Sequence, residues 1–280
     1  MKIKILGSGG GEGFPAMFCG CEHCNAARKA GGKSIRSLSQ AIINDDLLID
    51  FPTDTNMHAL AHSLNLGNVE NILVTHNHSD HFVPVVLDER GGLNAHKMKF
   101  EKVGIVGSKE VIDLFEKVFS VYDIEKEYLD NIKLTNMNAE QTKVLGKYKV
   151  TALKASHSEN TGPLNYIIDD GERCLLYLLD TGYPTGDTLD FIQRYYKQMD
   201  CVIMDATMGI LPERKYRYHM SFGDNKLLKE ELLSRKIAND KTRFIISHIT
   251  HNQAETHDKI EEIFIGTGIE VAFDGMNIDL

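Results

Sequence analysis

Short apolar segments recur along the whole chain with the alternating or continuous pattern of β-strands. Most are four to eight residues long, and polar or glycine-containing turns separate them. The segments are KIKIL (2–6), AIIN (41–44), LLID (47–50), ILVT (72–75), VGIV (103–106), YKVTALKA (148–155), LNYIID (164–169), RCLLYLLD (173–180), CVIMD (201–205), RFIIS (243–247) and VAF (271–273). The pattern predicts a protein that is rich in β-sheet.

Helical periodicity predicts helices between several of these strands, at residues 55–64, 108–119, 186–198, 222–235 and 252–264. The strands between residues 148 and 180 follow one another without a helix, which favours antiparallel pairing, whereas strands and helices alternate later in the chain. We therefore expect an α/β (α+β) fold in which two mixed sheets pack face to face with helices outside. Residues 82–100 and 206–219 are predicted to be loops, and loops of that length often form lids or binding elements.

The length and composition fit one globular domain over residues 1–280, with 42% hydrophobic and 25% charged residues. The net charge of −9 argues against a general nucleic-acid binder, because binding to phosphate backbones needs a basic surface. The N-terminal segment lacks the apolar region of a secretion signal, and no apolar run reaches the length of a membrane span. We expect a cytoplasmic protein that makes no membrane contact. The oligomeric state stays open, with a homodimer as one option.

The strongest chemical signal is the segment THNHSDH, which directly follows the apolar strand at 72–75. Three imidazoles and one carboxylate within six residues are hard to place in a core, because each would need a buried hydrogen-bond partner. The alternative is a solvated, histidine-rich turn. At a strand end, His76 and His78 point the same way and can chelate one ion, while Asp80 and His81 turn toward a neighbouring position.

Further ligands must come from elsewhere in the chain, since one ion needs more than two protein ligands and two ions need several. His157, Asp180 and His248 each come at or just after the end of an apolar strand. Scaffolds built on sheets present catalytic groups at such positions. Each of the three alone would be interpreted as an ordinary loop or turn residue, but their occurrence together behind HxHxDH favours a shared metal site.

The HxHxDH motif followed by single His, Asp and His residues at later strand ends resembles the metallo-β-lactamase superfamily, and this resemblance covers essentially the whole chain. It implies a four-layer αββα sandwich. It also implies one metal on His76, His78 and His157, a second on Asp80, His81 and His248, and Asp180 bridging both. The flavodiiron branch has Glu where this chain has His78, and zinc β-lactamases often have Cys where it has Asp180.

This ligand set predicts a metal-dependent hydrolase. Two divalent ions about 3.5–4 Å apart can generate a bridging hydroxide at neutral pH and hold both oxygens of an in-line displacement, which favours phosphodiesters. Zinc or manganese is expected, although such ligands also accept iron. The alternatives are a nuclease that resembles the tRNA 3′-end maturation enzyme, a thioester or lactone hydrolase, and a metal- or ligand-binding or cofactor-biosynthesis protein without catalysis.

A second metal motif is the C-x-C-x2-C array of Cys19, Cys21 and Cys24, one thiolate short of a tetrahedral zinc site. Buried unpaired thiols are the alternative, but the intervening residues are polar. His23 is a cramped fourth ligand, and His251, three residues after His248, is the better candidate. With HxHxDH, these motifs resemble the phosphodiesterase branch of the bacterial carbon-phosphorus lyase pathway. That resemblance implies a structural Cys3His zinc and a small phosphodiester substrate, such as a cyclic nucleotide or cyclic sugar phosphate.

His219 precedes Ser221 and Asp224, whose spacing predicts a capping box and therefore a helix start. The imidazole is thus expected on a loop. The resemblance implies that it protonates the leaving oxygen, so Asp80 and His219 are the expected catalytic residues; a surface histidine is the alternative. The nearby Arg214, Lys215 and Arg217 either hold a phosphate or form a solvated charge run.

The remaining motifs are assigned to structure. His58 and His62, four residues apart, are predicted to lie on a helix surface, because no third ligand is in reach. Cys174 and Cys201 lie in apolar strands and are expected to be inert. The glycine-rich segment at residues 7–13 lacks the ending of a phosphate-binding loop, and we expect a tight turn that brings backbone close to the metals.

Overall fold

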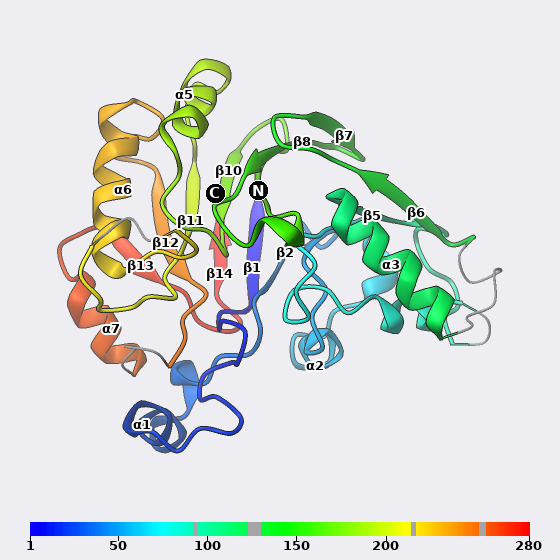
Figure 1. Cartoon of the computed structure of the whole chain (residues 1–280), viewed down its shortest axis with the longest axis horizontal. Helices are drawn as coiled ribbons and strands as arrows, with labels where there is room; N and C mark the ends of the chain where they lie inside the picture. Colours follow the sequence, from blue (N-terminus) through cyan, green and yellow to red (C-terminus); the bar gives the residue numbers. More distant parts are fainter. Residues whose placement is uncertain (92–93, 123–129, 214–216, 252–255) are drawn as a thin grey trace.

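Two seven-stranded β-sheets lie face to face in the computed structural model, which describes residues 1–91, 94–122, 130–213, 217–251 and 256–280 (Figure 1). Each sheet contains both parallel and antiparallel pairs. The prediction of two packed mixed sheets is therefore confirmed.

The first sheet comes mainly from the N-terminal half of the chain. Its strands are parallel from β3 to β6 and antiparallel from β14 to β3. Their order is β14 (Asn277–Asp279), β1 (Lys2–Gly7), β2 (Gln40–Ile43), β3 (Leu47–Ile49), β4 (Asn71–Leu73), β5 (Val103–Gly107) and β6 (Ile132–Asn136).

The second sheet comes from the C-terminal half. The predicted antiparallel pairing of the strands before residue 180 is confirmed, and the later strands pair in parallel. The order is β13 (Ile269–Val271), β12 (Arg243–Ser247), β11 (Cys201–Asp205), β10 (Cys174–Leu178), β9 (Leu164–Asp169), β8 (Tyr148–Lys154) and β7 (Thr142–Leu145).

The alternation of side chains along each strand divides the core into layers. In β11, Ile203 faces the other sheet, while Val202 and Met204 face the outer helices. Continuous apolar strands such as CVIMD thus bury both faces, because each sheet is covered on both sides. Ile5 and Ile245 belong to the central layer between the sheets.

Helices cover the outer faces and complete the four-layer sandwich. Along the first sheet lie α2 (Thr55–Ala61) and α3 (Lys109–Val121), and α3 packs Phe115 and Phe119 onto it. The second sheet carries α5 (Gly186–Tyr195), α6 (Phe222–Ser234) and α7 (His257–Phe264). Single helical turns occur at η1 (Gly32–Ser34), η2 (Leu66–Asn68) and η4 (Glu159–Thr161), and a longer one at η3 (Pro84–Arg90). Among the described helices, none has the length and apolar character to cross a membrane.

The sequence pattern missed helix α1 (Glu22–Ala30) and the strands β6, β7 and β14. Strands β6 and β7 are partly exposed, and β14 is only three residues long, so their apolar signal is weak. In α1, the Cys21 side chain caps the helix by accepting the Cys24 amide, a role that the metal motif concealed. The predicted loop at 82–100 contains η3, and residues 252–255 of the helix predicted at 252–264 lie outside the described residues.

The prediction that His58 lies on the helix surface is wrong. Its side chain is 1% exposed, and its ring contacts the Gln40 Oε1 atom at 2.6 Å and the Ser37 Oγ atom at 2.7 Å. Helix α2 turns this face toward β1, where a Cβ atom on Gly7 would lie 2.9 Å from the ring. Burial lowers the pKa of His58. His62 is half-buried.

Replacing Ile245 with Ala should lower the free energy of unfolding by about 2–5 kcal/mol, because the change leaves a cavity between the two sheets. Ile245 is fully buried on strand β12, in the apolar layer between the two sheets. Chemical denaturation followed by circular dichroism measures the effect. Val144→Ala, at a side chain that is 77% exposed, is the control and should change stability by less than about 0.5 kcal/mol.

Candidate metal centre

The residues predicted to bind the two metals converge at one end of the sandwich. The segment from His76 to His81 follows β4 of the first sheet. His157 follows β8, Asp180 follows β10 and His248 follows β12 of the second sheet. Asp180 and His248 adopt left-handed backbone conformations, with φ of 52° and 61°. Such conformations are uncommon for residues other than glycine and occur most often at functional sites.

Three groups of side chains form here with the spacing of metal ligands; two contain only predicted metal ligands, and the third joins Asp180 and His248 to Asp205 and His219. The potential ligand atoms of His76, His78 and His157 all lie within 4.8 Å of one another. The second group, with the same spacing, contains Asp80, His81, Asp180 and His248. The sequence analysis paired the same residues, with Asp180 common to both positions.

The Asp180 carboxylate lies between the two groups. Its Oδ2 atom is 2.8 Å from the His81 Nε2 atom and 3.4 Å from the His76 Nε2 atom. The His248 Nε2 atom lies 3.5 Å from the same oxygen. Asp180 is 3% exposed, so its charge needs partners nearby. A carboxylate in this position can bridge two cations.

Hydrogen bonds to the other ring nitrogens orient the imidazoles. The His81 Nδ1 atom contacts the Asp50 carboxylate at 2.8 Å, and the His248 Nδ1 atom contacts Thr207 Oγ1 at 2.7 Å. The His157 Nδ1 atom lies 3.3 Å from the Tyr218 carbonyl oxygen, which can only accept. These contacts leave the Nε2 atoms free toward the centre. Metal-binding histidines almost always have such an arrangement, so the residues present fit a divalent metal.

The sequence analysis missed Asp50 and Asp205, two buried carboxylates behind the centre. Asp50 follows β3 and accepts hydrogen bonds from the amide and hydroxyl of Thr75 as well as contacting His81. Asp205 ends β11 and accepts from the Thr207 hydroxyl. Both residues terminate apolar strands, which is the signal that singled out Asp180, so the sequence held the information to find them.

The carboxylates and imidazoles of the centre have shifted pKa values because they are buried close to one another. Burial opposes ionisation of Asp180, but His248 and His76 hold its pKa well below the usual range. Burial likewise opposes ionisation of Asp80, while the hydrogen bond with His81 lowers its pKa. Burial lowers the pKa of His76. Both carboxylates are therefore anionic at neutral pH, and His76 is neutral, which are the forms that bind cations.

His219 lies at the open side of the centre and is 22% exposed. Its Nδ1 atom is 3.2 Å from the Asp205 Oδ2 atom and 3.2 Å from the Asp180 Oδ1 atom. Burial works against protonation, but Asp205 raises the pKa of His219 to about 9. The predicted capping box of Ser221 and Asp224 is present and begins α6 directly after this loop. The histidine is thus a partly exposed imidazole held beside the Asp180 and Asp205 carboxylates.

The glycine-rich segment lies against the centre as expected. A Cβ atom on Gly10 would lie 2.5 Å from the Thr250 Cγ2 atom, and one on Gly11 would lie 3.1 Å from the Asp80 Oδ2 atom. Backbone pairing holds the segment in place, because the Ile249 amide donates to the Ser8 carbonyl oxygen. A side chain at Gly10 would displace Thr250.

The cysteine motif forms a separate group beside this segment. The ligand atoms of Cys19, Cys21, Cys24 and His251 lie within 4.8 Å of one another. The Cys21 Sγ atom is 3.7 Å from the His251 Nδ1 atom. The structure thus brings His251, rather than the alternative His23, to the three thiols. Cys174 and Cys201 lie apart in the second sheet, and burial raises the pKa of each to about 12.

Of the three basic residues that precede His219, only Arg217 is among the described residues. Arg214 and Lys215 lie outside the described residues. The Arg217 guanidinium is exposed and lies 3.3 Å from the Glu159 carboxylate. Its position fits a solvated surface residue.

A cleft of about 720 Å³ opens beside Asp80. Its lining includes the exposed residues Met17, Phe18, Thr53 and Ser79. Pockets for small ligands commonly have about 300–1,000 Å³. The centre is therefore accessible to a small molecule.

Alkylation of the chelator-treated protein should begin at Cys21. A hydrogen bond from the Cys24 amide, with a further contribution from His251, lowers the pKa of Cys21 to about 6. The thiolate is therefore present above about pH 6, and the rate should reach its plateau near pH 7. Burial raises the pKa of Cys24 to about 11, so this thiol should react slowly. Iodoacetamide labelling and peptide mass spectrometry from pH 5 to 10 measure both rates; a Cys21 midpoint near pH 9 would contradict the assignment.

The chain is also similar in sequence to known proteins. Residues 47–249 match the family model of the β-lactamase superfamily domain. A ribonuclease Z of Picrophilus torridus is 25% identical over 228 residues, which span 78% of this chain and 65% of that protein. The chain thus spans about two thirds of the length of this curated relative.

Solved structures show the same fold. A diphosphatase of the PhnP family has a TM-score of 0.74 at 18% identity, with 100% of this chain and 97% of that chain covered. The zinc-bound PqqB of Methylobacterium extorquens has a TM-score of 0.68 at 18% identity and covers 100% of both chains. The fold, the match to the family model and the grouped His and Asp side chains together show that the chain belongs to the metallo-β-lactamase superfamily.

Proposed function

We propose that this protein is a dinuclear metallohydrolase that cleaves a small phosphodiester. The observation that carries the proposal is the meeting of two ligand groups at the shared carboxylate of Asp180. The family match and the names of the relatives, a ribonuclease and a diphosphatase, support hydrolysis at phosphorus.

In this proposal, His76, His78 and His157 would hold one divalent cation, and Asp80, His81 and His248 would hold the other. The Asp180 carboxylate, which lies between the two groups, would serve both. When bound, two such cations supply a hydroxide nucleophile at neutral pH and neutralise the charge that develops on the phosphate. Cys19, Cys21, Cys24 and His251 would hold a structural zinc, since three thiolates and an imidazole suit tetrahedral coordination.

The chain's own residues contribute position and proton transfer. Asp50 and Thr207 fix the rings of His81 and His248, so the centre needs little reorganisation when substrate arrives. His219 is the general acid that gives its proton to the departing oxygen. It is held by Asp205 and lies at the open side of the centre.

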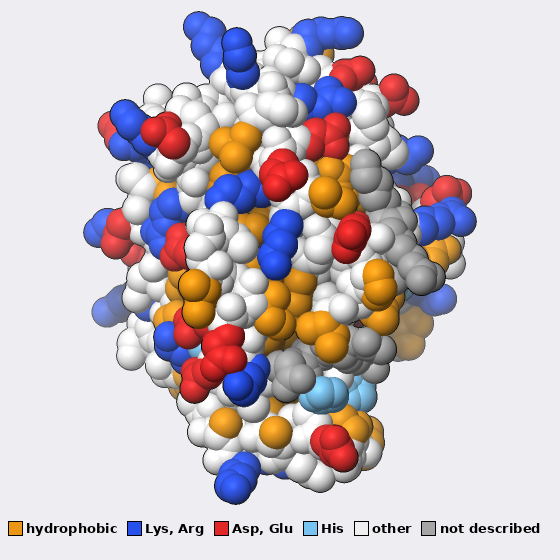
Figure 2. All heavy atoms as spheres, turned by 90° about the vertical axis from the view of Figure 1, so that its left-hand side faces the viewer, with side chains coloured by type: hydrophobic (Ala, Val, Ile, Leu, Met, Phe, Trp, Pro, Cys, Tyr) orange, Lys and Arg blue, Asp and Glu red, His pale blue; other side chains and the backbone are white. Residues whose placement is uncertain are grey.

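A small substrate fits the cleft better than a polynucleotide does. Glu12, Asp54 and Asp80 line it. Among the described residues, Arg36 is the one Lys or Arg in the lining, and it is buried and donates to Ala272 and Ser8. The acidic walls would repel a chain of phosphates, whereas a single phosphodiester can be held by the cations. On the face shown in Figure 2, basic and acidic side chains are interspersed and do not form a continuous basic surface.

The second candidate is a ribonuclease, because the curated relative is a ribonuclease Z. RNA binding depends on basic surface that releases counterions. The net charge of −9 and the acidic cleft make RNA the weaker candidate.

Asp180→Ala should lower both metal content and turnover, with turnover of bis(p-nitrophenyl) phosphate reduced about 100-fold or more, because both cation positions lose a ligand. Elemental analysis of the purified protein should give three metals per chain for the native sequence and fewer for the variant. Asp240→Ala is the matched control, because Asp240 is exposed and is not a proposed metal ligand. It should change neither the metal content nor the turnover.

The same purified proteins should then be tested on a five-membered cyclic ribose phosphate, a precursor tRNA and an acyl thioester. We expect metal-dependent turnover of the cyclic phosphodiester well above that of the other two. Preferred cleavage of the tRNA would favour the ribonuclease, and preferred cleavage of the thioester would reject phosphodiester chemistry. Full activity of Asp180→Ala with one bound metal would reject the dinuclear centre.

His219→Gln should lower kcat for the cyclic phosphodiester about 10²- to 10⁴-fold, since its alkoxide leaving group needs a proton. For bis(p-nitrophenyl) phosphate, whose leaving group is stable as an anion, kcat should fall less than about tenfold. Steady-state kinetics on both substrates measures this difference. An equal loss on the two substrates would assign His219 a structural role instead.

A further inference from the structure

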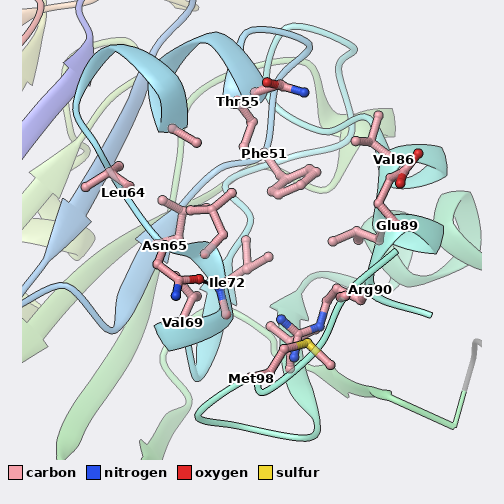
Figure 3. Close-up of a pocket in the computed structure, with 18 of the residues that line it drawn as sticks. Phe51, Thr55, Leu64, Asn65, Val69, Ile72, Val86, Glu89, Arg90 and Met98 are labelled. Atoms are coloured by element: carbon pink, nitrogen blue, oxygen red, sulfur yellow. Dashed lines mark hydrogen bonds between the residues drawn. The ribbon is translucent and has the colours of Figure 1, made fainter. Parts of the chain in front are cut away.

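The outer face of the first sheet holds a second cavity, remote from the metal ligands. It has a volume of about 690 Å³ and lies between α2, η2 and η3 (Figure 3). This volume is in the range of small-molecule sites in proteins. None of the residues proposed above to bind metal lines it.

Neighbouring residues on one strand end separate the cavity from the metal centre. The Asp50 carboxylate contacts His81 on the side of the centre, whereas the Phe51 ring faces the cavity. The Phe51 amide donates to the His81 carbonyl oxygen, and Phe51 forms a bridge with Phe82. A molecule in the cavity would therefore contact the wall of the centre but not its ligands.

The floor of the cavity is apolar, whereas several polar side chains contribute to the rest of its lining. Its floor is formed by Leu48, Ile72 and Val103 from the outer face of β3, β4 and β5, with Val69 and Phe51 beside them. Aliphatic and aromatic side chains in this arrangement favour an apolar group through burial of its surface.

One guanidinium lies among the polar lining residues. Arg90, at the end of η3, donates from its Nη2 atom to the Phe100 carbonyl oxygen at 2.8 Å. Its Nε atom is buried and has no hydrogen-bond partner. Among the described residues, no acidic side chain forms an ion pair with Arg90, and burial lowers its pKa. In Figure 3, Arg90 lies beside Met98, and the acidic lining residue Glu89 lies nearer to Val86.

Arg90 thus lines the cavity with a half-buried cation that has no ion-pair partner among the described residues, and an anion in the cavity would compensate for this charge. The apolar floor and the Arg90 guanidinium together favour a ligand that has an apolar part and an anionic part. We propose that the cavity binds a small amphiphile whose aliphatic tail lies on the floor and whose carboxylate or phosphate head group pairs with Arg90. This site is independent of the proposed phosphodiesterase reaction.

Isothermal titration calorimetry with octanoate, octyl phosphate and the neutral control 1-octanol, all below micelle-forming concentrations, tests the proposal on the full-length protein as purified. We expect saturable one-to-one binding, with at least one anion bound about tenfold or more tightly than octanol because of the charge-assisted hydrogen bonds. The tighter anion identifies the head group.

Two variants locate the site. Arg90→Gln should remove the advantage of the anions while octanol binds within about twofold of the native protein. Ala59→Phe, which places a ring in the cavity from α2, should weaken all three ligands by about tenfold or more. Arg194→Gln, at an exposed position on α5, is the matched control and should change nothing.

If the anion that binds more tightly than octanol binds equally to the native protein and to Arg90→Gln, the proposal is overturned. Octanoate binding that survives in Ala59→Phe would also overturn it, because the ligand would then lie elsewhere, such as on the metals. If Arg90→Gln does not fold, the native protein still decides: equal affinities for octanol and both anions, or no saturable binding, would reject the site.

Discussion

The buried carboxylate of Asp180 is the group on which the rest of the centre depends. It is 3% exposed, and an ionised carboxylate in that environment is stable only with compensating charge or hydrogen bonds. Imidazoles surround it: His76, His81 and His248 near one oxygen, and His157 and His219 near the other. A cation bound at either side would satisfy the same requirement more strongly. The centre is thus organised around the neutralisation of one anion.

The sandwich brings these metal ligands together because each half of the chain supplies some of them from the ends of its strands. The first sheet presents the segment after β4, and the second presents His157, Asp180 and His248. The apolar layer between the sheets fixes how those strand ends face one another, since residues such as Ile5, Tyr166 and Ile245 pack there. The geometry of the metal centre is therefore a consequence of packing that lies outside it.

Hydrogen bonds from residues around the centre fix the orientation of its histidine rings. Asp50, Thr207 and the Tyr218 carbonyl oxygen each engage one ring nitrogen of a histidine and so direct the other toward the cations. The same strand end that carries Asp50 places Phe51 in the cavity on the outer face of the sheet. The metal centre and the outer cavity thus share a wall. This is possible because successive residues after β3 face opposite sides of the sheet.

The sequence by itself determined much of this protein. Continuous apolar strands required sheets covered on both faces, the lack of helices between residues 148 and 180 required antiparallel strands, and the density of His and Asp in THNHSDH required a site rather than a core. Periodicity and local composition carry that information. Tertiary structure alone decided which distant residues meet. It buried His58, which the sequence predicted to lie on a helix surface, and it made Asp50 and Asp205 partners of the histidines. It also brought His251 to the cysteines and left Arg90 without an acid among the described residues. Contacts of this kind depend on sheet order and on the packing of layers, and local pattern does not encode either.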